Sequence, residues 1–286
     1  MSAIKNYDIL GVKIDALTMN QAAAMIIEHA GSKQPSCYVV KPYVEFLDEA
    51  SRQPALKTLL NNAWLRLPDA ISLQWASTYL YGERHSWWRV MILGAQIIVR
   101  PNALKHYIPE KFAGATFSWK IVKMAAKQQQ SIYLIGSPKG SSITKTAEII
   151  KQAEPQITIA GTHAGIIGGK SGTALRTALT HKDIEADLVA DLIKTKPDLI
   201  MVGMGFPLQE ELMAKLVKQV NHGVFIGEGG TFDYDSFGGG RTRAPRFVQH
   251  IGLEWLWRLL LEPSRIRRQL AIPRFIWAVY RDSKKA

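Results

Sequence analysis

The sequence predicts an α/β fold in which a Rossmann-like, mostly parallel sheet is flanked by helices and followed by a small helical C-terminal appendage. Short apolar segments suited to buried strands alternate with longer segments of helical periodicity along most of the 286 residues. Several of these strand segments run directly into glycine-rich turns. With 47% apolar and 21% charged residues, the chain has the composition of a globular protein.

The first elements follow from local patterns. Tyr7–Asp15 has the pattern of a short hairpin, and Thr18 is placed to cap a helix that ends at Gly31. We expect a buried strand at 36–42, one helix over 44–63, a strand at 64–70 and a helix over 71–82. The strand–helix rhythm then resumes with strands at 131–136, 157–163, 197–204 and 223–228, separated by helices at 142–154, 184–196 and 208–220.

The chain divides at a glycine-rich run, Phe237–Pro245, where the composition shifts to arginine and tryptophan. We therefore predict a catalytic α/β domain over 1–240 and a helical appendage over 241–286. Residues 82–112 break the rhythm with adjacent tryptophans and several basic side chains. This insertion is either a membrane-interface hairpin or a segment that packs its own small core.

Charge points to an anionic partner. The net charge is +12, and residues 241–286 hold eleven Lys/Arg against three acids. Nucleic acid, anionic lipid or a phosphorylated substrate would each fit. We expect no nucleic acid, because helix-turn-helix, zinc and RNP patterns are missing and the arginines alternate with Leu and Trp. The lone Cys37 favours a reducing, cytoplasmic setting, and the longest apolar run, Val90–Val99, reaches about half of a membrane span, which suggests a soluble or peripheral protein.

The ends of the strands are where a ligand is expected, because open parallel sheets bind ligands beyond their carboxyl ends. Gly136, Gly203, Gly205 and Gly227 lie at such ends and would let the backbone approach a diphosphate. Neither a P-loop nor a complete dinucleotide fingerprint is present, so each glycine alone fits an ordinary tight turn. Together they favour a nucleotide-type ligand.

Polar side chains at the same strand ends have two interpretations each. Asp69 follows a strand and precedes a helix, so it is either a helix N-cap or a general base at the mouth of the sheet; Asp233 has the same ambiguity. Gln209 lies in the first turn of a predicted helix, where its side chain is a candidate for ligand binding. His163 is either a hydrogen-bonding partner for a sugar or phosphate or a loop residue without function. No metal-ligand spacing is recognisable, so we expect no metal and no cofactor.

The C-terminal arginines are spaced for convergence. Arg258, Arg265 and Arg268 fall within about 80° of one another on a continuous helix, and arginine makes forked contacts with phosphate. The alternative is a solvated basic face.

Several motifs resemble the WecG/TagA/CpsF glycosyltransferases. They are "ILGVKIDALTMNQA", "LPDAISL", "GTHAG", "DLIMVGMGFPLQE", "GGTFDY" and the run from Arg243 to Leu270. The resemblance implies an inverting, metal-independent transfer of a sugar such as N-acetylmannosamine from UDP to a polyprenyl-diphosphate-linked saccharide, for a cell-surface polymer. It further implies a peripheral protein on the inner face of the cell membrane, and it is compatible with a homo-oligomer.

Residue roles follow from the same resemblance. Asp69 would be the general base, Gln209 would lie in the catalytic pocket, and Arg258, Arg265 and Arg268 would hold the diphosphate. The substrate-binding positions that we expect are Lys41, Tyr43, Gly136, His163, Gly203, Gly205, Gly227, Asp233 and Arg243.

This chain departs from the family pattern near the proposed base. Lys41 and Tyr43 stand where the family usually has Thr and Asn, Ala70 replaces the glycine after the aspartate, and Thr116 replaces an acidic residue. Lys41 would stabilise the leaving diphosphate, lower the pKa of Asp69, alter donor specificity or mark a lost activity. The alternative function is therefore an inactive relative that binds nucleotide-sugar or lipid diphosphate.

Overall fold

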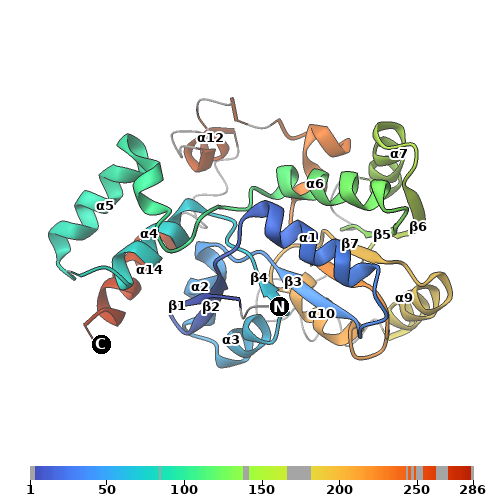
Figure 1. Ribbon diagram of the computed structural model, residues 1–286, viewed down its shortest axis with the longest axis horizontal. Coiled ribbons are helices and arrows are strands. Elements are labelled where there is room, and N and C mark those ends of the chain that lie inside the picture. Colours follow the sequence, from blue (N-terminus) through green and yellow to red (C-terminus); the bar gives the residue numbers. More distant parts are fainter. Residues whose placement is uncertain are drawn as a thin grey trace.

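The computed structural model describes residues 4–83, 85–137, 142–165, 182–242, 244–245, 248, 254–261 and 270–284. Its centre is a six-stranded parallel sheet in the order β4-β3-β8-β7-β5-β6 (Figure 1). The strands are β3 (Cys37–Val40), β4 (Leu65–Arg66), β5 (Ser131–Ile135), β6 (Thr158–His163), β7 (Leu199–Val202) and β8 (Val224–Gly227). The predicted Rossmann-like α/β class is confirmed.

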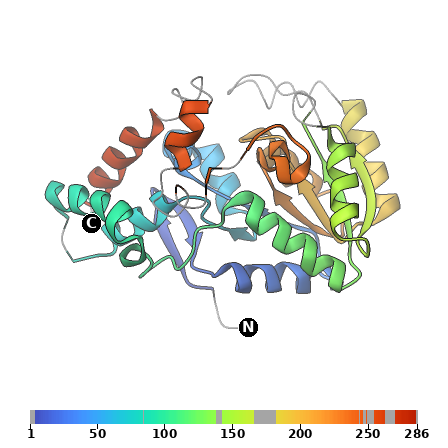
Figure 2. The same cartoon turned by 90° about the horizontal axis from the view of Figure 1, so that it is seen from above.

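The sheet is covered on both faces because its strands are apolar on both sides, as buried parallel strands are. One core lies under α1 (Met19–Ala30), α6 (Gly114–Lys127) and α7 (Ile143–Ala153). The other lies under α2 (Val44–Ala50), α3 (Pro54–Asn61), α9 (Lys182–Thr195), α10 (Leu208–Leu216) and α14 (Ala271–Asp282). Figure 2 shows α1 and α6 side by side on one face of the sheet.

The N-terminal hairpin forms as predicted. β1 (Asn6–Ile9) and β2 (Val12–Asp15) pair antiparallel across Leu10 and Gly11, which both adopt positive φ. Thr18 then caps α1 in a capping box with Gln21, whose backbone N–H donates to the Thr18 hydroxyl.

Two expectations for the helices were wrong. The single helix predicted over 44–63 is two helices, because Pro54 has no N–H to continue the first and instead starts the second at its N-terminus. The sequence reading also left out α6, whose buried face is made of small residues between larger ones. Residues 82–112, left open above, form α5 (Trp87–Val99) and the 3-10 turn η1 (Pro101–Leu104).

The C-terminal helix α14 is part of the same core as the sheet. Phe275 and Val279 are fully buried, and they belong to the core that contains the residues of α2 and α4 (Ile71–Leu80). Asp48 of α2 accepts hydrogen bonds from Arg274 of α14 and from Arg52. The division at 240/241 remains a prediction.

Within the described ranges, none of the helices is both long and apolar enough to cross a bilayer.

We predict that Phe275→Ala lowers the free energy of unfolding by about 3–5 kcal/mol, since it removes a fully buried ring that joins α14 to the core. Urea denaturation measures the change. Arg281→Ala, on the exposed side of the same helix, is the control and should change stability by less than about 0.5 kcal/mol. Equal effects of the two substitutions would show that α14 does not contribute to the common core.

Candidate active site

The functional side chains gather at one edge because all six strands run in the same direction. Lys41 follows β3, Asp69 follows β4 and Glu228 follows β8. Gly203 follows β7, and His163 closes β6. Strands β4, β3 and β8 are neighbours in the sheet, so the first three of these residues lie at adjacent strand ends.

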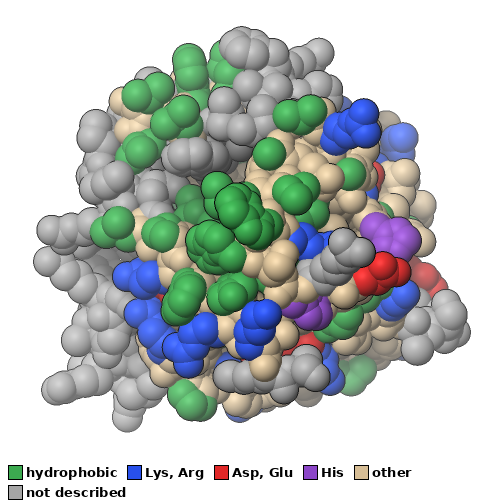
Figure 3. Space-filling view, turned by 90° about the vertical axis from the view of Figure 1, so that its left-hand side faces the viewer, with side chains coloured by type: hydrophobic (Ala, Val, Ile, Leu, Met, Phe, Trp, Pro, Cys, Tyr) green, Lys and Arg blue, Asp and Glu red, His purple; other side chains and the backbone are tan. Residues whose placement is uncertain are grey.

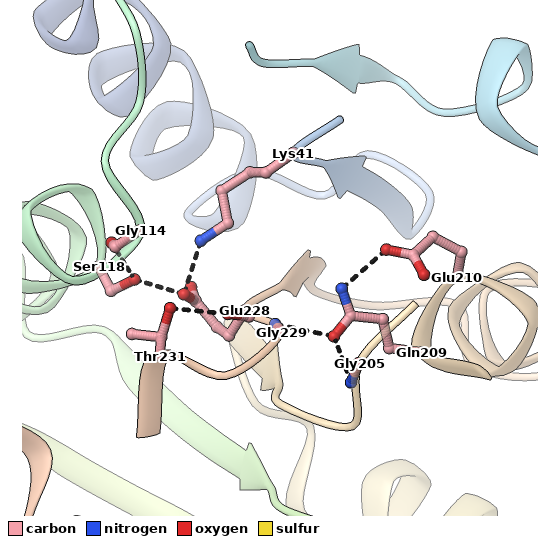
Figure 4. A network of polar contacts seen from close by, with 9 residues as sticks. All are labelled: Lys41, Gly114, Ser118, Gly205, Gln209, Glu210, Glu228, Gly229 and Thr231. Carbon is pink, nitrogen blue, oxygen red and sulfur yellow. Dashed lines mark hydrogen bonds and ion pairs between the residues drawn. The ribbon is translucent and has the colours of Figure 1, made fainter. Parts of the chain in front are cut away.

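The centre of this edge is an ion pair between Lys41 and Glu228 (Figure 4). The pairing of Val39 with Ile226 places the two residues opposite each other, two positions further along β3 and β8. Lys41 Nζ lies 2.6 Å from Glu228 Oε2, and the exposed fractions of the two side chains are 5% and 0%. A buried charge is tolerated when it is paired, so Glu228 balances the charge of Lys41.

The same carboxylate is held from the opposite side by α6. The Ser118 hydroxyl reaches both Glu228 Oε2 and the Gly114 carbonyl, the latter at 2.8 Å, and it can donate to either. Thr231 donates to the Glu228 backbone carbonyl at 2.7 Å. The other carboxylate oxygen, Oε1, is buried without a hydrogen-bond partner among the described residues. Glu228 Oε1 is therefore a buried hydrogen-bond acceptor in the candidate site.

A second polar group joins the turns after β7 and β8. Gln209 Oε1 accepts from the backbone N–H of Gly205 at 3.1 Å and of Gly229 at 2.8 Å, and its Nε2 donates to Glu210 Oε1 at 2.7 Å. The buried Gln209 side chain thus fixes the shape of both turns, as Figure 4 shows. Its assignment to the catalytic pocket remains a prediction.

Glu210 is buried beside this amide. Burial raises the pKa of its carboxyl group to about 7, against a smaller opposing effect of the hydrogen bond from Gln209. The Glu210 Oε2 atom has no partner within the described part of the chain. The carboxyl group therefore titrates near neutrality inside the site.

Asp69 lies at the turn from β4 into α4 and is partly exposed. Its backbone N–H donates to the Pro42 carbonyl at 2.9 Å, which ties the ends of β4 and β3 together. The N-cap of α4 is Ala70, without a side-chain cap. The N-cap interpretation of Asp69 is therefore wrong, because the helix begins one residue later than that interpretation needs. Its role as general base stays a prediction.

The strand-end glycines have packing reasons of their own. A Cβ atom at Gly203 would come within 2.4 Å of the Phe232 ring, and one at Gly136 or Gly227 would meet Ile143 or Gln209. Gly205 differs, because its φ is +80° and no described atom lies within 4 Å of the Cβ position. Among these four glycines, Gly205 is where a ligand has room to approach the backbone.

Tyr43 packs in a cluster of aromatic rings. Its hydroxyl donates to Glu45 at 2.8 Å, its ring packs on Phe46, and Phe46 stacks on Phe206 with ring centroids 3.9 Å apart. The turns after β3 and β7 are therefore in contact through aromatic rings.

Two other candidates are held by their own loops. His163 Nδ1 accepts from the Gly165 N–H at 3.0 Å, and burial lowers the pKa of this ring. Asp233 pairs with Arg241 at 2.8 Å and closes the glycine-rich loop. Ligand roles for both remain predictions. The side chains of Arg243, Arg258, Arg265 and Arg268 lie outside the described residues. No group of His, Cys, Asp and Glu in the described part could hold a metal ion.

Glu228, Ser118 and Glu210 are the site residues that sequence reasoning missed. Glu228 had a signal, since it is an acid directly after a buried strand in "IGEGGTF". For Ser118 and Glu210 the sequence offers no signal beyond helix periodicity. The contact of Ser118 with Glu228 joins segments that are far apart in the chain.

Family membership follows from a match of the amino-acid sequence to a family model. A sequence model of the glycosyl transferase WecG/TagA/CpsF family matches residues 7–93 and 85–286. The chain therefore belongs to this family, and it is a glycosyltransferase. The matched ranges span Lys41, Asp69, Gln209 and Glu228.

Two curated relatives carry the same protein name, N-acetylglucosaminyldiphosphoundecaprenol N-acetyl-beta-D-mannosaminyltransferase. The one from Staphylococcus aureus (strain NCTC 8325 / PS 47) is 26% identical over 281 residues, 97% of this chain and 93% of the relative. The one from Bacillus spizizenii is 26% identical over 247 residues, 86% of this chain and 80% of the relative.

We predict that Lys41→Met lowers the free energy of unfolding by about 3–5 kcal/mol, because it leaves Glu228 buried without a counter-charge. The double variant Lys41→Met/Glu228→Leu should recover most of that loss, since neither charge then remains. Denaturant unfolding of the two single variants and the double variant gives the coupling. Additive losses would contradict a direct pair.

We predict that stability falls as the pH rises from about 4.5 to about 7. The native state keeps the Glu210 proton up to a pKa of about 7, whereas the unfolded chain releases it near the ordinary 4.5. Glu210→Gln should flatten this window and be the more stable protein above pH 7. Urea titrations at pH 5 and pH 8 test this, with the exposed Glu28→Gln as control. An unchanged slope in Glu210→Gln would contradict the assignment.

Proposed function

We propose that this protein transfers an N-acetylmannosamine-type sugar from a UDP-sugar to a polyprenyl-diphosphate-linked saccharide, with Asp69 as the general base. The reaction belongs to the synthesis of a cell-surface polymer and takes place on the inner face of the cell membrane, where the protein is peripheral. The relatives' printed names describe this acceptor and this sugar.

The observation that carries the proposal is the position of Asp69. It follows β4, beside the ends of β3 and β8, and its backbone is fixed to Pro42. A carboxylate at the carboxyl edge of a parallel sheet stands where substrates of such folds bind. Because Asp69 is partly exposed, its side chain is accessible to an acceptor hydroxyl, unlike the buried Glu210 and Glu228.

The step is a single displacement. The acceptor oxygen forms a bond to C1 of the donor sugar while the bond from C1 to the UDP oxygen breaks, which inverts the configuration. The acceptor proton passes to the Asp69 carboxylate, and the electron pair leaves with UDP. General-base assistance of this kind contributes roughly 10²–10⁴-fold in rate.

Charge on the leaving diphosphate needs stabilisation from donors other than Lys41, because Lys41 is paired with Glu228. The backbone near Gly205, where space is open, and the arginines at 258, 265 and 268 are the groups that we assign to it. Lys41 and Glu228 instead form a neutral, polar floor, and the unpartnered Glu228 Oε1 can accept a hydroxyl of the donor sugar. This favours altered donor specificity over a direct diphosphate contact.

A second candidate function is a relative that binds nucleotide-sugar or lipid diphosphate without turnover. The ion pair at the position of the family's threonine favours it. Mass spectrometry of products from a panel of UDP-sugars with a lipid-diphosphate acceptor separates the two candidates, since only the enzyme forms a new glycosidic bond.

We predict that Asp69→Asn reduces turnover by roughly 10²–10⁴-fold, because the amide cannot take the acceptor proton. Donor binding and the unfolding midpoint should stay near those of the unchanged protein. Glu28→Gln, on the exposed side of α1, is the control and should be fully active. Full activity of Asp69→Asn would refute the assignment of the base.

A further inference from the structure

The insertion at 82–112 folds with its apolar side facing outward. On α5, Val90 and Leu93 are buried, with exposed fractions of 5% each. The opposite side exposes Trp88 by 77% and Val99 by 75%. The exposed stripe of α5 consists of Trp87, Trp88, Met91, Ile92, Ala95 and Val99, without a charged residue among them.

This stripe continues onto α14. Trp87 packs edge-on against Trp277 and Tyr280, with ring centroids 6.4 Å and 5.5 Å apart. Trp277 is itself 53% exposed. We define the α5–α14 face as the exposed apolar side chains of these two helices and of the residue before α14: Trp87, Trp88, Met91, Ile92, Val99, Leu270 and Trp277. Soluble surfaces rarely gather such side chains without a partner.

The surroundings of the face are cationic. Residues 85–109 and 271–284 contain six Lys/Arg and a single acid, Asp282, and the acids Glu83 and Glu110 lie at the two ends of the insertion. The cations are Arg89, Arg100, Lys105, Arg274, Arg281 and Lys284, of which Arg274 is paired with Asp48. Figure 3 shows hydrophobic side chains gathered at the centre of this side of the molecule, with Lys and Arg along its lower margin. A second copy of the same cationic face would be repelled, whereas an anionic surface would be attracted.

We propose that the α5–α14 face docks on an anionic phospholipid bilayer, with α5 lying flat at the level of the headgroups. Tryptophan favours this depth, and cations beside an apolar stripe are the pattern of interfacial helices. The 13 residues of α5 are too short to span a bilayer, which needs about 20. The proposal rests on the membrane-linked acceptor of the proposed function and names the surface that meets the membrane.

The face is rigidly joined to the active site. α5 and α14 both pack on α4, which begins at Ile71, two residues after Asp69, and α14 also packs on α2, which begins after Tyr43. Lys284 donates to the His85 carbonyl at 2.7 Å and so fixes the end of α14 to the start of the insertion. Figures 1 and 2 place α5 and α14 beyond the β4 end of the sheet, away from β6.

Sedimentation of the full chain with vesicles tests the proposal. The protein should bind vesicles that contain phosphatidylglycerol and bind phosphatidylcholine vesicles much less. Trp88→Gln/Ile92→Gln should weaken binding at least about tenfold. Arg100→Gln/Lys105→Gln should weaken only the phosphatidylglycerol-dependent part and make it less sensitive to salt. Ile193→Gln, which changes a 50% exposed residue on α9, is the matched control and should bind normally.

Three outcomes would overturn docking. They are no binding of the unchanged protein to phosphatidylglycerol vesicles, normal binding of Trp88→Gln/Ile92→Gln, and a dimer that this double variant dissociates, which would make the face a self-association surface. A soluble short-chain lipid-diphosphate acceptor separates docking from catalysis. The double variant should turn it over normally, whereas Asp69→Asn should bind vesicles normally without turnover. Docking without any turnover by the unchanged protein would refute the proposed function alone.

Discussion

The parallel pairing of β3 with β8 determines how this active site is built. It carries Lys41 and Glu228 to the same level of the sheet, where neither side chain reaches solvent. Burying one charge alone would cost several kcal/mol, so each residue is tolerable there because the other is present. Ser118 then contacts the Glu228 carboxylate from α6, and Gln209 holds the turns after β7 and β8.

The ion pair changes how the departures from the family pattern are understood. A lysine near a diphosphate-binding edge suggests a phosphate ligand when the sequence is considered alone. Its pairing with Glu228 balances the charge and leaves Glu228 Oε1 as a hydrogen-bond acceptor without a partner among the described residues. Tyr43 is similarly absorbed into a stack with Phe46 and Phe206. Both residues are therefore held by neighbouring side chains of this chain, Lys41 by an ion pair and Tyr43 by aromatic packing.

The proposed base and the proposed membrane-docking face are connected through the same helices. α4 begins at Ile71, two residues after the proposed base, and packs against α5, while α2 begins at Val44, after Tyr43, and packs against α14. This packing would suit the proposed bilayer-attached acceptor, because a fixed distance between base and membrane would position the reacting hydroxyl without further ordering. On α5 and α14 the exposed tryptophans lie on the outer side, whereas Phe275 of α14 is buried in the core.

The sequence by itself determined the α/β class, the hairpin, the capped first helix and the position of Asp69 at a strand end, since these depend on periodicity and on neighbours a few residues apart. It also carried the family resemblance. Only the tertiary structure decided that Lys41 meets Glu228, 187 residues away, that Ala70 rather than Asp69 caps α4, and that α5 turns its apolar stripe outward. Those outcomes depend on strand order and helix packing, which place distant segments together and leave no local pattern in the chain.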